Sequence, residues 1–145
     1  MEIRAVCEAD RDRWLPLWRG YQEFYRTKID ESVTATTWQR FLNPAEPVHC
    51  AVVEDNKQLI GIVHFIFHRS CWTEGDYVYL QDLFVKPNIR GKGIGRALIE
   101  YVVARGQEAG ASRVWWLTHE SNCQAMLLYD RIAEKSGFVQ YRKML

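Results

Sequence analysis

The amino-acid sequence predicts one α/β domain, residues 1–145, built on a mixed and mostly antiparallel β-sheet. The length suits one domain, and the 48% of hydrophobic residues predicts a packed core. Strand-like segments follow one another in the middle of the chain, whereas strands and helices alternate in its second half. Successive strands favour antiparallel pairing, and a strand–helix–strand order favours parallel pairing, so the sheet is expected to be mixed.

The first half of the chain is predicted to form an edge strand, two helices and a hairpin. One face of the first helix carries Trp14, Trp18, Tyr21 and Tyr25 at helical spacing, which indicates core or a dimer surface. The expected elements are a strand over 2–6, a helix from an N-cap at Asp10 to about residue 25, a helix over 36–42, and hairpin strands over 49–54 and 59–68.

The second half of the chain is predicted to extend the sheet and to add two helices. The helix over 93–108 is the clearest element, because Ile94, Leu98 and Val102 recur on one apolar stripe. Gly110 and Gly137 follow the two helices, as residues that end helices often do. The expected elements are a strand over 77–85, the helix over 93–108, a strand over 113–118, a helix from 122 to about 135, and a last strand over 138–143.

The charge balance and the cysteines argue against several classes of protein. The 19 basic and 18 acidic residues nearly cancel, so no field of one sign attracts nucleic acid or an anionic membrane. The four cysteines form no CxxC pair, and His64 and His68 lack the further ligands of a zinc site, so free thiols and no metal are expected. No apolar stretch has the length of a membrane span or the form of a secretory signal. We therefore expect a cytoplasmic protein.

A glycine-rich turn before the third helix predicts a pyrophosphate site. A strand ending in Val85 leads into a loop, and the loop opens a helix whose first amides lack intrahelical partners and attract an anion. Glycines let a ligand approach the backbone, and cationic side chains surround them. The dinucleotide and P-loop patterns are absent, and a glycine-softened turn with a solvated helix start is the alternative. The residues of this turn are Arg90, Gly91, Lys92, Gly93, Ile94, Gly95 and Arg96.

A second motif follows the next strand, with the pattern Asn-x-x-Ala-x-x-Leu-Tyr over residues 122–129. Asn122 alone suits an ordinary N-cap, and Tyr129 alone suits an aromatic residue of an amphipathic helix. Their occurrence together, after the glycine-rich turn, favours a functional site. A phenol with a pKa near 10 stays protonated at neutral pH and can donate its proton to a departing thiolate.

Together the two motifs resemble those of the GCN5-related N-acetyltransferase (GNAT) superfamily, most closely its yeast Hpa2/Hpa3-like and spermidine/spermine-type branch. The resemblance implies the GNAT fold, with about six to seven strands flanked by about four helices. It also implies acetyl-CoA as cosubstrate, with Asn122 at the pantetheine arm and Tyr129 as the acid that protonates the coenzyme thiolate. The implied coenzyme-binding residues are Leu83, Phe84, Val85, Arg90, Gly91, Lys92, Gly93, Ile94, Gly95, Arg96, Asn122 and Tyr129.

The group that accepts the proton of the attacking amine is left open by the sequence. Polyamine acetyltransferases often have Glu-Asp on the central strand, whereas this chain has Gln81-Asp82. Asp82 is one candidate, and a β-bulge would re-aim its side chain. Glu120 is the second candidate, and His119 is the third, although His119 also suits a local hydrogen bond within its loop.

The resemblance implies transfer of an acetyl group to a primary amine of a small molecule, such as a polyamine or an amino acid, by direct attack in a ternary complex. The alternatives are a protein or peptide lysine acetyltransferase and a non-catalytic acyl-CoA-binding sensor. The aromatic face of the first helix corresponds to a wall of the acceptor site in related enzymes. Relatives of this branch often dimerise through their last strands, so a homodimer is expected.

Overall fold

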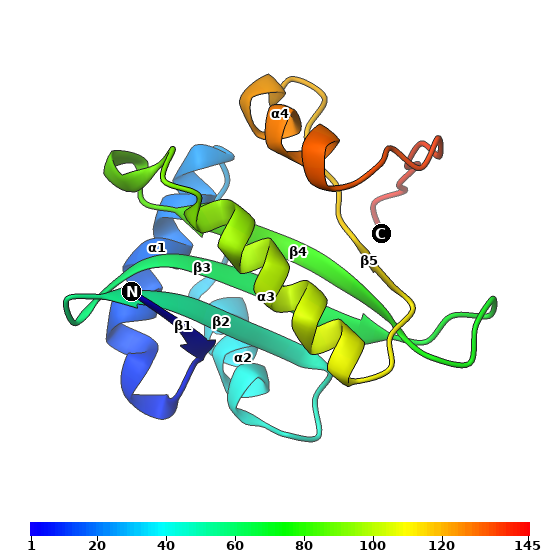
Figure 1. Ribbon diagram of the computed structural model, residues 1–145. Coiled ribbons are helices and arrows are strands. Elements are labelled where there is room, and N and C mark those ends of the chain that lie inside the picture. The colour runs from blue at the N-terminus through cyan, green and yellow to red at the C-terminus, as the bar shows by residue number, and fades with distance from the viewer.

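All 145 residues are described by the computed structural model, in which helices cover both faces of a five-stranded sheet (Figure 1). The strand order is β1-β2-β3-β4-β5, with antiparallel pairing from β1 to β4 and parallel pairing between β4 and β5. This confirms the mixed, mostly antiparallel sheet. The elements are β1 (Glu2–Ala5), α1 (Arg11–Phe24), α2 (Glu31–Leu42), β2 (Val48–Asp55), β3 (Gln58–His68), β4 (Tyr77–Val85), α3 (Ile94–Glu108), β5 (Arg113–Trp115) and α4 (Cys123–Ile132).

Two hydrophobic cores lie on opposite faces of the sheet. Leu98, Ile99 and Val102 of α3 pack against one face, where the largest buried cluster lies. Trp14 and Trp18 of α1 and other residues pack against the opposite face. Figure 1 shows α3 across one face and α1 with α2 across the other. None of the helices is both long enough and apolar enough to cross a membrane.

The last predicted strand is absent, so the expectation of six to seven strands was too high. Helix α4 ends at Ile132, and residues 133–145 form neither helix nor strand. Phe138, Val139 and Tyr141 are 83%, 78% and 93% exposed. Aromatic and β-branched residues of this kind favour a strand, but a strand also needs a neighbouring edge to satisfy its backbone groups. Within this chain the tail pairs with no such edge.

Other element boundaries also differ from those predicted. Helix α2 begins at Glu31 rather than residue 36, and β5 ends at Trp115 rather than residue 118. Asp10 is the N-cap residue of α1, as predicted, but its side chain makes no capping hydrogen bond to that helix. Its carboxylate instead accepts hydrogen bonds from the guanidinium groups of Arg4 and Arg13, at 2.7 Å each. Two charged donors form stronger bonds to a carboxylate than a single backbone amide does.

Candidate active site

A β-bulge in β4 directs Asp82 toward α1. His64 pairs with Asp82 and Phe65 pairs with Leu80, so Gln81 is the additional residue on β4. Leu80 belongs to the core under α3, whereas Phe84 belongs to the core under α1. Because strand side chains alternate, the extra residue reverses which face each position serves. Asp82 lies on the α1 face together with Phe84, two positions further on, and with Tyr79, three positions before it, which a regular strand would place on the opposite face.

Asp82 lies beneath three tyrosines, which we call the tyrosine cluster: Tyr21 and Tyr25 from α1, and Tyr79 from β4. Burial, followed by the negative charge of Asp82, raises the pKa of each of these phenols above its ordinary value. All three are therefore protonated at neutral pH and lie within electrostatic range of one carboxylate. The rings of Tyr21 and Tyr25 lie 4.9 Å apart. The cluster thus places three protonated phenols near a single negative charge.

Tyr129 joins the same region from α4. Its ring lies 5.5 Å from that of Trp116, edge to face, and packs at the border of the core under α3. Burial, followed by the neighbouring phenol of Tyr25, raises the pKa of Tyr129. Tyr129 is therefore a protonated phenol at neutral pH. Because Tyr25 is within electrostatic range of both Asp82 and Tyr129, it links the carboxylate to the phenol.

The glycine-rich turn exposes the beginning of α3. Gly91 and Gly93 adopt φ angles of 86° and 79°, in the left-handed region that favours glycine. A β-carbon built on either residue would meet no atom within 4 Å, so the space outside the turn is open. The N-cap of α3 is Gly93, and the amide of Ala97 donates to its carbonyl at 3.0 Å. The amides that precede Ala97 have no acceptor within the helix and are available to an anion.

The cationic side chains of the turn differ in the hydrogen bonds and ion pairs that they already make. Arg90 donates from Nε to the carbonyl of Val85 at 3.0 Å, and its guanidinium lies over the rings of Phe24 and Phe84. Arg96 forms an exposed ion pair with Glu100. Lys92 makes no hydrogen bond or ion pair and is exposed. Lys92 is therefore the cation that a phosphate group meets with the least rearrangement.

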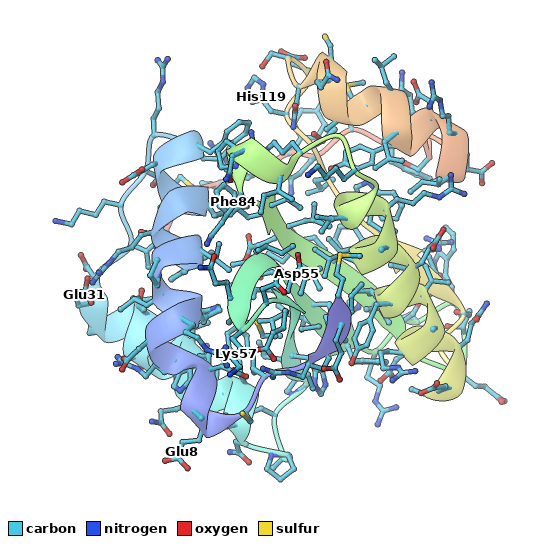
Figure 2. All side chains as sticks on the ribbon, turned by 60° about the vertical axis from the view of Figure 1, so that its left-hand side comes forward. Glu8, Glu31, Asp55, Lys57, Phe84 and His119 are labelled. Carbon is cyan, nitrogen blue, oxygen red and sulfur yellow. The ribbon has the colours of Figure 1, made fainter.

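One edge of β4 is open next to this turn. Strand β5 pairs only with Tyr77–Tyr79, so the edge from Leu80 to Val85 has no strand beside it. Leu83 lies at the border of the core under α3, and Phe84 is buried between β4 and α1 (Figure 2). A ligand with amide groups, such as a pantetheine arm, can pair with the free backbone groups of this edge. The predicted residues Leu83, Phe84 and Val85 thus lie beside an accessible backbone edge.

The loop before α4 holds the remaining predicted residues. Asn122 is the N-cap of α4 but makes no side-chain capping bond, so its amide oxygen is not committed to the helix. His119 accepts at Nδ1 from the amide of Ser121 at 3.1 Å, the local bond that was the alternative to a catalytic role. Figure 2 shows His119 beside α4. Glu120 is exposed and makes no hydrogen bond or ion pair, and nothing connects it to Asp82.

Two residues of the site were missed by the sequence-based analysis. For His64 and His68 the sequence favours packing or sheet-surface positions, with the acceptor cleft as the alternative for one of them; Nδ1 of His64 lies 2.9 Å from Oδ2 of Asp82. Tyr79 was seen only as part of a strand. The pairing of His64 with Asp82 depends on the register between β3 and β4, and the position of Tyr79 on the same face as Asp82 depends on the bulge. The signal for such a site is a histidine within an apolar strand followed by an aspartate in the next strand.

Comparison with known proteins identifies the family. Residues 7–133 match the family model described as "Acetyltransferase (GNAT) family". The D-amino-acid N-acetyltransferase HPA3 of Saccharomyces cerevisiae is 36% identical over 143 residues, covering 97% of this chain and 89% of that protein. The thialysine N-epsilon-acetyltransferase of Mus musculus is 30% identical, covering 97% of this chain and 90% of that protein.

A solved structure has the same fold. An aminoglycoside N-acetyltransferase in complex with CoA superimposes with a TM-score of 0.77 at 17% identity, covering 99% of this chain and 100% of that one. The chain belongs to the GNAT family, and it is an N-acetyltransferase. Members of this family use acetyl-CoA.

Proposed function

We propose that this enzyme transfers an acetyl group from acetyl-CoA to a primary amine of a small cationic molecule, by direct attack in a ternary complex. The observation that carries the proposal is the Asp82 carboxylate, which lies close to the phenols of the tyrosine cluster. A cationic amine is attracted both by a carboxylate and by the faces of aromatic rings. The names of the HPA3 and thialysine relatives support a small amine as acceptor.

The coenzyme is proposed to lie along the open β4 edge and across the glycine-rich turn. The amides of the α3 N-terminus and Lys92 are suited to a pyrophosphate, and the edge from Leu83 to Val85 is suited to the amides of pantetheine. Asn122, whose side chain is not used for capping, is available to the same arm. When bound, acetyl-CoA supplies the activated acetyl thioester. Arg90, which packs on aromatic rings, contributes to the positive potential of the turn.

Two residues are proposed to move protons during the transfer. The amine nitrogen forms a bond to the acetyl carbon while the carbon–sulfur bond breaks. Asp82 first pairs with the ammonium form and then accepts its proton, directly or through a water. Neutralising an alkylamine at pH 7 costs roughly 4–5 kcal/mol, so a nearby proton acceptor contributes to the rate. Tyr129 donates its phenolic proton to the departing thiolate and recovers one from solvent.

The experiment that tests this function is a screen for acetyl-CoA-dependent product formation, followed by mass spectrometry of the acetylated amine. The panel contains spermidine, thialysine, lysine, D- and L-amino acids, an aminoglycoside and a lysine-containing peptide. The proposal predicts turnover of at least one small amine, at a higher kcat/KM than the peptide. Preference for the peptide would favour the protein lysine acetyltransferase. Tight acetyl-CoA binding without any turnover would favour the sensor.

A homodimer is also proposed, and the exposed tail supports it. Residues 133–145 present Phe138, Val139 and Tyr141 to solvent, which is costly for a monomer. The β5 edge away from β4 is unpaired as well. We expect light scattering to give twice the 17.1 kDa mass of one chain. A Phe138→Ser, Tyr141→Ser double variant should shift the mass toward one chain; a monomeric wild-type protein at tens of micromolar would contradict this proposal.

A further inference from the structure

A buried hydrogen-bonded chain connects the apolar core under α1 to Asp82. The indole nitrogen of Trp14 donates to Nε2 of His64 at 3.1 Å, and Nδ1 of His64 lies 2.9 Å from Oδ2 of Asp82. Trp14 is 0% exposed and His64 is 3% exposed. The chain therefore begins in the core and ends at the carboxylate that the tyrosine cluster surrounds.

The first bond of this chain determines the tautomer of His64. An indole N–H is a donor and has no acceptor function, so Nε2 of His64 has to accept and cannot carry a proton. The proton of the neutral imidazole is then on Nδ1, and Nδ1–H donates to Asp82. Because Asp82 is the only acceptor paired with Nδ1, the imidazole acts as a donor directed at one carboxylate oxygen.

The orientation of the His64 ring is also fixed by its packing. The rings of Trp18 and Phe41 lie 4.9 Å and 4.8 Å from it, and that of Trp14 lies 5.9 Å away. Rotation of the imidazole ring by half a turn would break both hydrogen bonds, and the neighbouring aromatic rings offer no other polar partner. Burying a polar group without a partner costs about 1–3 kcal/mol, so the observed orientation is strongly preferred.

We propose that His64 is a positioning residue for the proton acceptor Asp82, and that Trp14 holds His64 in its Nδ1–H tautomer. This inference rests on the proposed role of Asp82 in the transfer reaction. The bond to Oδ2 fixes the carboxylate and stabilises its charged form, which leaves Oδ1 for the amine. The other titratable groups near Asp82 are the phenols of Tyr21 and Tyr25 from α1 and of Tyr79 from β4, and the buried thiol of Cys50 from β2.

The tautomer is tested without reference to activity. Nitrogen-15 chemical shifts of the histidine rings report which nitrogen carries the proton. In the wild-type chain we expect an unprotonated Nε2 and a protonated Nδ1 for His64 at neutral pH. Trp14→Phe retains an aromatic ring but removes the donor, so both tautomers should become populated. A wild-type proton on Nε2 would overturn the proposal directly.

The positioning role is tested by the acidic limb of the pH–rate profile, measured with the best small amine of the screen. His64→Leu removes the donor; because a carboxylate without its donor binds a proton more strongly, the limb should move to higher pH by about one unit. The loss of kcat at neutral pH should be about 10-fold, the order expected for one hydrogen bond to a charged group. His64→Asn places an amide N–H near the position of Nδ1 and should restore most of both quantities.

His68 provides the matched control on the same strand. It also accepts an indole N–H, from Trp115 at 2.9 Å, but its Nδ1 faces the carbonyl of Arg69 rather than a carboxylate. His68→Leu should leave the acidic limb in place. Asp82→Asn should remove the limb, and if it does not, the proposed role of Asp82 fails and the positioning role fails with it. If Asp82→Asn removes the limb but folded His64→Leu leaves it unmoved, only the positioning role is wrong.

Discussion

At Tyr129, the chemistry and the packing of the side chain can be separated by removing one atom. The ring contacts Trp116 and the border of the core, whereas only the hydroxyl can donate a proton. The raised pKa of Tyr129 keeps that hydroxyl protonated at neutral pH. A role in thiolate protonation therefore depends on the oxygen alone, and a structural role depends on the ring.

Tyr129→Phe should lower kcat by about 10²–10⁴-fold, the range of general acid catalysis, while the affinity for acetyl-CoA stays close to that of the wild type. Steady-state kinetics and calorimetry measure the two quantities on the same sample. Tyr141→Phe, a change in the exposed tail, is the matched control and should be silent. Full kcat in Tyr129→Phe would show that the thiolate departs without this proton.

At the scale of elements, Gly93 of the glycine-rich turn has two properties that favour glycine. Its backbone is left-handed, and the space beside it is open to a ligand. Gly110 has a φ angle of 76° and a similarly open surround, but it ends α3 at the opposite end from the turn. Comparison of the two glycines separates backbone strain from loss of ligand contact. Each alanine should cost roughly 1–2 kcal/mol of stability, because its backbone is left-handed.

Gly93→Ala should also weaken acetyl-CoA binding by about 10-fold or more, the order of one charge-assisted hydrogen bond lost at the helix N-terminus. Gly110→Ala should retain wild-type affinity in the same calorimetric titration. Equal affinities for the two folded variants would place the pyrophosphate away from this turn.

The ion-pair cluster at Asp10 ties β1 to α1. Its carboxyl has no exposed surface, and hydrogen bonding to Arg4 holds the pKa of Asp10 well below its usual value. Because the folded-state pKa is the lower one, this contribution to stability is complete above the unfolded value of about 3.9 and is lost as the pH falls below it.

Asp10→Asn should lower the free energy of unfolding at pH 7 by about 1.5–3 kcal/mol, since it removes a buried charged acceptor shared by the guanidinium groups of Arg4 and Arg13. The difference in the free energy of unfolding between the variant and the wild type should shrink below about pH 4, because Asp10 of the unfolded wild-type chain then binds a proton. Urea denaturation at pH 7 and pH 3 measures it, with the exposed Asp12→Asn as control. An unchanged difference at pH 3 would contradict this account.

For the whole molecule, local sequence patterns predicted most helices and strands. The features that they did not predict depend on pairing between residues that are distant in the sequence. The apolar stripe of α3 and the hairpin of β2 and β3 are local signals, and both elements form near their expected bounds. The tail from residue 138 has a strand pattern but no partner edge, which no local pattern reveals. Asp10 occupies its predicted N-cap position, but no local pattern reveals that its carboxylate accepts hydrogen bonds from Arg4 of β1 and Arg13 of α1.

The residues of the candidate site also fall into those that local patterns predicted and those that depend on distant pairing. The glycine-rich turn and Tyr129 were found because each lies in a contiguous motif. Trp14 was predicted only as part of the aromatic wall, and the relation of His64 and Tyr79 to Asp82 was not found, because it depends on the register between β3 and β4 and on the shift within it. A β-bulge near Asp82 was considered from the sequence. Whether it forms depends on how side chains pack on both faces of the sheet, which the sequence of one strand does not show.

The central claim is that the acceptor amine binds and loses its proton at Asp82, and steady-state kinetics of Asp82→Asn with the best small amine test it most directly. The account predicts a raised KM, because the carboxylate no longer pairs with the ammonium group, and loss of the acidic limb of the pH–rate profile. Asp76→Asn, which changes an aspartate paired with Arg69 before β4, should show neither effect. An unchanged KM and an unchanged profile in folded Asp82→Asn would contradict the account.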